Sequence, residues 1–321
     1  MAQTSQGLVM VTGASGFIGR ALSARLLSEG VRVRGVVRRS ESAVPYGTEK
    51  VIVHSIEQDT NWSPLLKGVD TVVHLAARVH VIKERTADPL HEFRKVNVAG
   101  TERLAQMSLA AGVRRIVYVS SIGVNGEITS GKAFTEEDVP SPCSPYAISK
   151  WEAEEILRRI GNYGAMEVVI VRPPLVYGPH APGNFGRMVR LIKSGLPLPF
   201  GGVKNMRSLI YLGNLVDALV KCIQREEAAG RTFLISDGED ISTPDMIRMI
   251  AKAMGVKERL VTIPEPLLML MGNILRKRPE LEKLVHSLCI DSSKIRRVLN
   301  WIPPFTIEEG IRETVRWIGA R

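Results

Sequence analysis

The sequence predicts an α/β fold in which a doubly wound parallel sheet is followed by a smaller, mostly helical C-terminal lobe. In the first half of the 321-residue chain, short apolar segments alternate with amphipathic ones, as parallel strands joined by helices do. After a segment rich in proline and glycine, helical periodicity dominates. Because this length exceeds one ordinary core, we expect two lobes, 1–175 and 176–321, with segments near 207–236 returning to the first.

Six apolar segments of the first half are the predicted strands. Several are apolar without alternation, which is typical of parallel strands covered by helices on both faces. The helices between them imply right-handed crossover connections. In chain order the strands are "LVMVT" (8–12), "VRVRGVV" (31–37), "KVIVHS" (50–55), "DTVVHLA" (70–76), "RRIVYVSS" (114–121) and "MEVVIVRP" (166–173), with further candidates near 208–212 and 232–235.

Capping residues mark where several helices begin. Asp88 and Ser63 each precede a proline, which places a capping side chain before the first helical position. Thr306, with Glu309 three residues later, predicts a capping box for the last helix.

The composition is that of an ordinary globular protein, with 45% hydrophobic and 24% charged residues. No apolar run reaches the roughly 18–20 residues that span a bilayer, and the first residues lack the apolar core of a signal peptide. We therefore expect a cytoplasmic protein without stable membrane insertion. Cys143, Cys222 and Cys289 are widely spaced and the six histidines show no metal-ligand spacing, so we expect no metal.

The net charge of +10 is explained first by scattered, solvated Lys and Arg side chains. Among specific partners, nucleic acid usually needs a clustered basic patch with aromatics, and aromatic residues make up only 5% of the chain. We therefore expect no nucleic acid, and an anionic small molecule fits the charge better.

The first predicted strand ends in "TGASGFIG", where Gly13, Gly16 and Gly19 form a G-x-x-G-x-x-G array. Glycine permits the tight turn and lets a diphosphate approach the backbone. The helix that follows offers unpaired N–H groups and a partial positive charge at its N-terminus. Since the array lies between an apolar strand and a helix, it predicts dinucleotide binding.

A second motif, "SPYAISK", contains Tyr146 and Lys150. If Pro145 opens a helix, the i, i+4 spacing puts both side chains on one face. An ammonium group nearby would lower the pKa of the tyrosine from its usual value of about 10, so that Tyr146 could transfer a proton at a sugar hydroxyl. Ser120 and Ser121 end a predicted strand, where open α/β sheets bind ligands, and a serine there could hold the reacting oxygen.

Together with these motifs, "HLAA" (74–77), "NVAGT" (97–101), "SSIGVNG" (120–126) and "RPPLVYGP" (172–179) make the chain resemble the extended short-chain dehydrogenase/reductase family. The resemblance covers nearly the whole chain and points to the nucleotide-sugar epimerases and reductases, which have a Rossmann sheet. It implies three catalytic residues: Ser121, Tyr146 and Lys150. It implies substrate contacts from Ser121, Gly123, Tyr146, Asn184 and Arg207, the last at the diphosphate. Implied cofactor contacts are Gly13, Ser15, Gly16, Phe17, Ile18, Gly19, Arg38, Leu75, Ala76, Ala77, Asn97, Tyr146, Lys150 and Pro173.

Departures from the family pattern narrow the reaction. Sugar-nucleotide 4,6-dehydratases carry an Asp-Glu pair where this chain has Ile122 and Gly123, which argues against dehydration. Asn125 replaces the usual tyrosine of "VYG", and we expect it to reshape the sugar pocket. UDP-galactose 4-epimerases carry "RYFN" where this chain has "RPPL" (172–175), which weakens a direct match to them.

The second predicted strand ends in Val37 and is followed by Arg38 and Arg39. NAD-preferring relatives have an acid at the position of Val37, whereas a guanidinium binds the 2′-phosphate of NADP. We therefore expect NADP, with NAD as the alternative, and Arg38 as the main contact. A solvated basic turn is the competing interpretation.

These observations favour an NADPH-dependent reductase of a UDP-4-keto-6-deoxy-N-acetylhexosamine, in the synthesis of surface polysaccharide. The alternative is a 4-epimerase of UDP-glucose or UDP-N-acetylglucosamine that retains NAD. A third hypothesis, a non-catalytic dinucleotide-binding protein on the same fold, is disfavoured because such proteins commonly lose the tyrosine or the lysine.

Two further segments predict contacts with other molecules. The helix from about 89 to 111 carries more apolar positions than one face needs, which predicts a two-fold homodimer. The segment "PEPLLMLMGNILRKRPE" (264–280) is amphipathic with a basic end. We expect it in the core of the helical lobe, with contact to a membrane or a lipid-linked sugar as the alternative.

Overall fold

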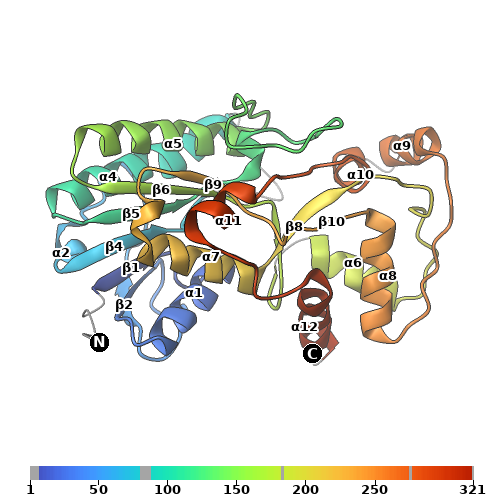
Figure 1. The fold of residues 1–321 in the computed structure, drawn as a ribbon, viewed down its shortest axis with the longest axis horizontal. Coiled ribbons are helices and arrows are strands. Elements are labelled where there is room, and N and C mark those ends of the chain that lie inside the picture. Colours follow the sequence, from blue (N-terminus) through green and yellow to red (C-terminus); the bar gives the residue numbers. More distant parts are fainter. Residues whose placement is uncertain (1–6, 80–87, 182–183, 275–276, 320–321) are drawn as a thin grey trace.

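The computed structural model describes residues 7–79, 88–181, 184–274 and 277–319, and confirms the predicted α/β fold. A seven-stranded sheet with every pairing parallel forms the larger part of the molecule (Figure 1). The strand order reverses between β1 and β4, the place where doubly wound sheets bind ligands. In spatial order the strands are β3 (Glu49–Ile52), β2 (Val33–Val37), β1 (Leu8–Thr12), β4 (Val69–His74), β5 (Arg115–Val119), β6 (Glu167–Arg172) and β9 (Thr232–Leu234).

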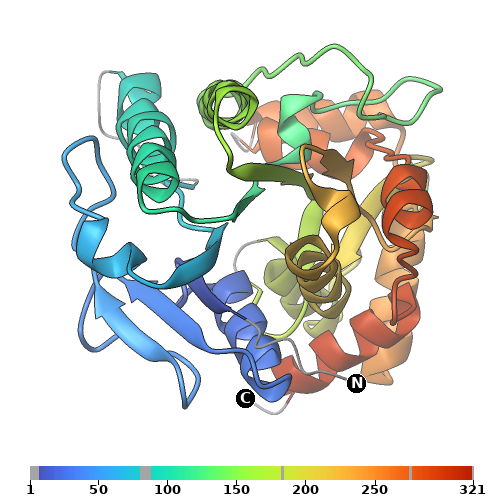
Figure 2. The ribbon, with the colours of Figure 1, turned by 60° about the vertical axis from the view of Figure 1, so that its left-hand side comes forward.

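Helices cover both faces of this sheet (Figure 2). Alternate residues of one strand enter different cores, because successive side chains of a strand point to opposite faces: Val9 and Val11 pack with one group of helices, and Leu8 and Met10 with the other. On the first face lie α1 (Phe17–Ser28), α7 (Leu212–Gln224) and α11 (Ser293–Leu299), and on the second α2 (Ser63–Leu66), α4 (Gly100–Ala110) and α5 (Pro145–Tyr163). Shorter segments complete this part: α3 (Pro89–Arg94), a π-helical turn (Lys95–Ala99) and 3₁₀ turns at Ile122–Val124 and Glu226–Ala228.

A second, three-stranded sheet carries a separate hydrophobic core. Its middle strand β8 (Arg207–Tyr211) pairs in parallel with β7 (Leu175–Tyr177) and antiparallel with β10 (Asp240–Ile241). The helices of this part are α6 (Asn184–Lys193), α8 (Thr243–Met254), α9 (Glu265–Ile274), α10 (Arg278–Val285) and α12 (Ile307–Gly319).

The chain crosses between the two sheets several times. After β8, α7 and β9 return to the first sheet, and α11 does so again before α12. Trp301 follows α11 in the core of the first sheet and donates a hydrogen bond from its indole N–H to Asp217 of α7 at 3.0 Å. We propose residue 175 as the boundary between the lobes, with these segments as returns.

Two of the three predicted helix starts are confirmed. The Asp88 carboxylate accepts the N–H of His91 at 3.0 Å at the start of α3. Thr306 and Glu309 form the reciprocal capping box before α12, with N–H to oxygen distances of 2.8 and 3.3 Å. The prediction for Ser63 is wrong by one position: Ser63 is the first helical residue of α2, and its N–H is accepted by the side chain of Asn61.

Candidate functional site

The predicted glycine turn lies between β1 and α1 and has the shape of a phosphate cradle. Gly13 has a φ of +70°, a conformation that favours glycine, and its carbonyl oxygen accepts the N–H of Gly16 at 2.9 Å. A Cβ at Gly19 would clash with that oxygen, and one at Gly16 would come within 3.1 Å of it. No side chain caps the N-terminus of α1. The turn therefore presents open backbone and unpaired N–H groups, as a dinucleotide diphosphate requires.

A cavity of about 670 Å³ opens beside this turn. Segments of both halves of the chain line it, which places the turn at the junction between the larger sheet and the second part. From the predicted cofactor set it is lined by Ser15, Gly16 and Phe17, and from the second half by Pro179, His180 and Leu212.

The segment after β4 lies directly against the glycine turn. The N–H groups of Leu75 and Ala76 both donate to the hydroxyl of Thr12, the last residue of β1, at 3.2 Å. A Cβ on Gly13 would meet the backbone nitrogen of Ala76 at 3.1 Å. The structure therefore brings the predicted cofactor-lining segment and the turn together, while Ala77 follows them half-buried.

Hydrogen bonding fixes one neutral tautomer of the buried His74. Because the Thr12 oxygen accepts two backbone N–H groups, its proton is directed to His74 Nδ1 at 2.7 Å. The Thr101 hydroxyl donates to the carbonyl of Asn97 at 2.7 Å, so the 3.0 Å contact with His74 Nε2 requires a proton on that nitrogen. Burial lowers the pKa of His74 to about 3, which keeps the ring neutral.

Asn97 continues this chain of hydrogen bonds to the helix that carries the tyrosine. Its amide N–H donates to Ser149 Oγ at 3.0 Å, and Ser149 donates to the carbonyl of Tyr146 at 2.7 Å. The Asn97 side-chain oxygen accepts the N–H of Arg78 at 2.8 Å. Asn97 therefore connects the segment after β4 with the first turn of α5, and its cofactor contact stays a prediction.

Ser121, Tyr146 and Lys150 gather around the end of β5. Ser121 follows this strand, and its Oγ accepts the N–H of Gly123 at 3.1 Å, which leaves the hydroxyl proton to be donated elsewhere. Gly123 packs against α5, since a Cβ there would lie 3.3 Å from the Cβ of Ala147. Ser144 caps α5 through the N–H of Ala147.

Lys150 is fully buried over an aromatic ring. Its Nζ lies 3.9 Å from the ring centroid of Tyr118, and the Tyr118 ring also stacks on His74 with centroids 5.7 Å apart. Burial lowers the pKa of Lys150 to about 7, against the opposing effect of the Glu154 carboxylate. A lysine with this pKa exchanges its proton near neutral pH.

The predicted decrease in the pKa of Tyr146 is not seen in this structure. Burial raises the pKa of Tyr146 to about 12, because the phenolate loses its hydration. The ring meets Phe93 of α3 edge-on, with centroids 6.1 Å apart. The direction predicted from the Tyr-x-x-x-Lys spacing is therefore wrong for the chain without cofactor or substrate.

A buried ion pair next to Lys150 is a feature that the sequence analysis missed. Arg172, at the end of β6, donates to both carboxylate oxygens of Glu154, at 2.9 and 2.5 Å, and both side chains are almost fully buried. Arg158 of α5 binds the same carboxylate from the half-exposed side at 2.8 Å. The sequence signal that could have revealed Glu154 is its i, i+4 spacing from Lys150, which places it one helical turn further along α5.

Asn125 belongs to this buried ion pair and not to the sugar pocket that was expected for it. Its side-chain oxygen accepts an N–H of Arg172 at 2.8 Å, and its amide donates to the carbonyl of Thr135 at 2.8 Å. An amide supplies both groups, an acceptor for the guanidinium and a donor for the loop, which explains why Asn125 points inward.

The remaining predicted residues occupy separate positions. Arg38 is exposed just after β2, and no ion pair joins it to another residue in the described ranges. Arg207 begins β8, half-buried, and donates to the carbonyl of His286 at 2.9 Å. Pro173 is buried and accepts the N–H of Ile122 at 2.9 Å. Asn184 is the first residue of α6, and its side chain lies outside the described part of the structure.

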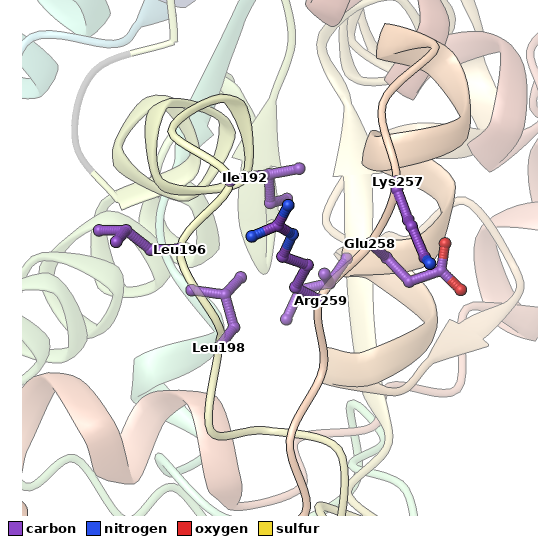
Figure 3. Close-up of a pocket in the computed structure, with 8 residues that line it drawn as sticks. Ile192, Leu196, Leu198, Lys257, Glu258 and Arg259 are labelled. Atoms are coloured by element: carbon purple, nitrogen blue, oxygen red, sulfur yellow. The ribbon is translucent and has the colours of Figure 1, made fainter.

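A second depression between α6 and α8 offers no site (Figure 3). It has no room for a water molecule, and its walls combine apolar side chains with charges of both signs. Among the described residues no group of three His, Cys, Asp or Glu side chains could hold a metal ion. The lining residues include Ile192, Leu196, Leu198, Lys257, Glu258 and Arg259.

Comparison with known proteins agrees with this geometry. The sequence model of the NAD dependent epimerase/dehydratase family matches residues 9–236, and the chain belongs to this family. The chain is 38% identical over 315 residues to a UDP-glucose 4-epimerase of Vibrio cholerae, covering 96% of this chain and 94% of that protein. It is 31% identical over 330 residues to a UDP-glucose 4-epimerase of Mycolicibacterium smegmatis, covering 96% and 97%.

Solved structures show the same arrangement. MoeE5 in complex with UDP-glucuronic acid and NAD superposes with a TM-score of 0.79 at 26% identity, covering 98% of this chain and 99% of that one. The protein is thus an enzyme of the extended short-chain dehydrogenase/reductase type, as the sequence motifs predicted. No helix in the described part of the chain is long and apolar enough to cross a membrane.

Proposed function

We propose that the protein is an NAD-dependent 4-epimerase of a UDP-hexose. One observation carries this proposal: the glycine turn and Ser121 follow β1 and β5 at the carboxyl edge of one parallel sheet, and Lys150, one helical turn after Tyr146, lies over Tyr118 of β5. The long match to UDP-glucose 4-epimerases, together with the absence of an Asp-Glu pair after Ser121, favours this reaction over dehydration.

The cradle of Gly13, Gly16 and Gly19 at the uncapped end of α1 fits a dinucleotide diphosphate. When bound, NAD supplies the acceptor of hydride from C4 of the sugar and then its donor to the opposite face. Tyr146 removes the proton of the C4 hydroxyl and later returns it. Ser121 donates its hydroxyl proton to the same oxygen and holds it in place.

Lys150 has two roles in this proposal. Its ammonium form, near the tyrosine, favours the phenolate, and its N–H groups bind a ribose hydroxyl of the cofactor. Because burial has already lowered the pKa of Lys150 to about 7, a hydrogen-bonding partner in the filled site would restore its charge.

The variant Tyr146→Phe tests the assignment of the proton carrier. We expect a loss of roughly 10²–10⁴ in turnover of UDP-glucose to UDP-galactose, because one general acid-base group is removed. The affinity for NAD, measured by titration calorimetry, should stay nearly unchanged. A variant that keeps more than a tenth of the parent turnover would exclude Tyr146 from this role.

A second candidate function is the NADPH-dependent reduction of a UDP-4-keto-6-deoxy-N-acetylhexosamine, and the exposed Arg38 after β2 favours it. If Arg38 binds a 2′-phosphate, Arg38→Ala should weaken NADPH by about 1.5–3 kcal/mol and leave NADH unchanged. Titration calorimetry with NADPH and NADH measures both affinities. The control is Arg32→Ala, which removes another exposed arginine of the same segment. Equal affinities of the parent for NADH and NADPH would remove the support that Arg38 gives to the reductase.

A further inference from the structure

The outer face of α9 is apolar and uncovered. Four side chains at helical spacing i, i+3, i+4 and i+7 face outward, and α9 carries a single charged residue, Glu265, at its start. We call these four the α9 ridge: Leu267, Leu270, Met271 and Ile274, which are 49, 53, 37 and 73% exposed. The expectation that this segment forms lobe core is therefore wrong for this face.

The opposite face of α9 is held firmly, so the ridge belongs to a fixed helix. Leu268 is buried in the core of the second part. Gly272 packs so closely on α10 that a Cβ would lie 2.7 Å from the side chain of Leu281. The Lys277 N–H, just before α10, donates to the carbonyl of Gly272 of α9 at 2.9 Å.

Among the described helices and strands, α9 exposes the most large apolar side chains. Large apolar side chains that are exposed elsewhere lie singly on different loops and helices, such as Tyr46, Val139, Tyr163 and Ile302, which is ordinary for a protein surface. Several on one face of a short helix mark a contact surface.

We propose that the α9 ridge rests on the surface of an anionic lipid bilayer, without spanning it. A convex ridge of four apolar side chains can enter the boundary between headgroups and acyl chains. Lys277 is exposed immediately beyond the helix, beside Arg278, whose guanidinium is paired with Glu282 of α10 at 2.7 Å. The net charge of +10 adds long-range attraction to anionic lipids.

A second copy of the chain fits this surface less well. A stable protein interface takes roughly 20–30 residues from each partner, and the ridge supplies four. Figure 1 places α9 at the outer end of the second part, away from the seven-stranded sheet, so it can touch a flat surface while the larger sheet stays in water. The proposal does not depend on which sugar nucleotide the enzyme uses.

Vesicle flotation of the full chain tests the proposal, with vesicles of phosphatidylcholine alone and of equal parts phosphatidylcholine and phosphatidylglycerol. We expect flotation with the anionic vesicles, weakening as salt is added. Ile274→Asp should reduce the bound fraction at least about tenfold, because it puts a charge into the ridge. The matched control is Ile302→Asp, which makes the same change at a side chain that is 76% exposed outside α9.

Each outcome decides for or against the lipid surface. Circular dichroism and turnover of a water-soluble sugar nucleotide should be the same for both variants and the parent. Absence of flotation by the parent, or equal flotation of Ile274→Asp and Ile302→Asp, would overturn the proposal. A parent dimer that Ile274→Asp converts to a monomer in light scattering would assign the ridge to a second copy instead.

Discussion

At the scale of single residues, the burial of Lys150 makes the folded chain sensitive to pH. Its pKa is lowered from 10.5 to about 7, so between these values the unfolded chain holds a proton that the folded chain lacks. The unfolded state therefore binds more protons in this window, and stability rises with pH across it.

Replacing this lysine removes that dependence. We expect Lys150→Met to be more stable than the cofactor-free parent, by a margin that grows as pH falls from about 10 to about 7, at up to about 1.4 kcal/mol per pH unit. Below pH 7 the margin should stay constant. Urea unfolding of both chains across this range measures it, with Lys132→Met as the exposed control. Parallel stability curves for Lys150→Met and the parent would contradict the low pKa.

Individual residues also show where reasoning from the sequence reached its limit. The glycine turn and the serine, tyrosine and lysine positions were predictable, because each needs a particular residue type at a fixed place after a strand or on a helix. The inward orientation of Asn125 was not, because its partner Arg172 is 47 residues away in the sequence. The pKa of Tyr146 was predicted in the wrong direction because desolvation depends on burial, which the motif does not encode.

At the scale of the elements, the pair Glu154 and Arg172 joins α5 to β6. This pair fixes the helix that carries Tyr146 and Lys150 against the end of the sheet, with Asn125 adding the loop before α5. Breaking a buried pair leaves one charge without its partner, which costs more than losing an exposed pair.

Arg172→Met should therefore destabilise the fold by about 3–5 kcal/mol, measured by urea unfolding at neutral pH. Arg158→Met, which removes the half-exposed partner of the same carboxylate, should cost about 1 kcal/mol or less. Similar losses for the two variants would show that Glu154 is not held mainly by Arg172.

The strands and helices of the first half were predictable because the hydrophobic periodicity and the residues that cap or end each element agree there. Each predicted strand of that half has an observed counterpart, and Asp88 begins α3 as expected. The returning helix α11 was not foreseen, since its packing on the first sheet depends on contacts such as Trp301 with Asp217, 84 residues apart in the sequence. The outward face of α9 was missed for a related reason: an amphipathic pattern shows that two faces differ, and tertiary packing decides which one is covered.

At the scale of the whole molecule, we propose that the first part binds the cofactor and carries out the reaction, while the second part contributes substrate contacts. The doubly wound sheet presents the glycine turn and the proposed catalytic side chains at one edge, and Pro179 and His180 of the second part line the cavity beside the turn. The two-fold homodimer stays a prediction. So do the substrate contacts of Asn184 and Arg207, which come from the second part.

The proposed 4-epimerase keeps its cofactor and returns the hydride to the same sugar. The measurement is to purify the chain, release its nucleotide by denaturation for mass spectrometry, and incubate the intact enzyme with UDP-glucose or UDP-N-acetylglucosamine without added cofactor. We expect retained NAD and formation of the corresponding galacto epimer. No epimer from either sugar, together with consumption of one NADPH per UDP-4-keto-6-deoxy-N-acetylhexosamine reduced, would contradict it and establish the reductase.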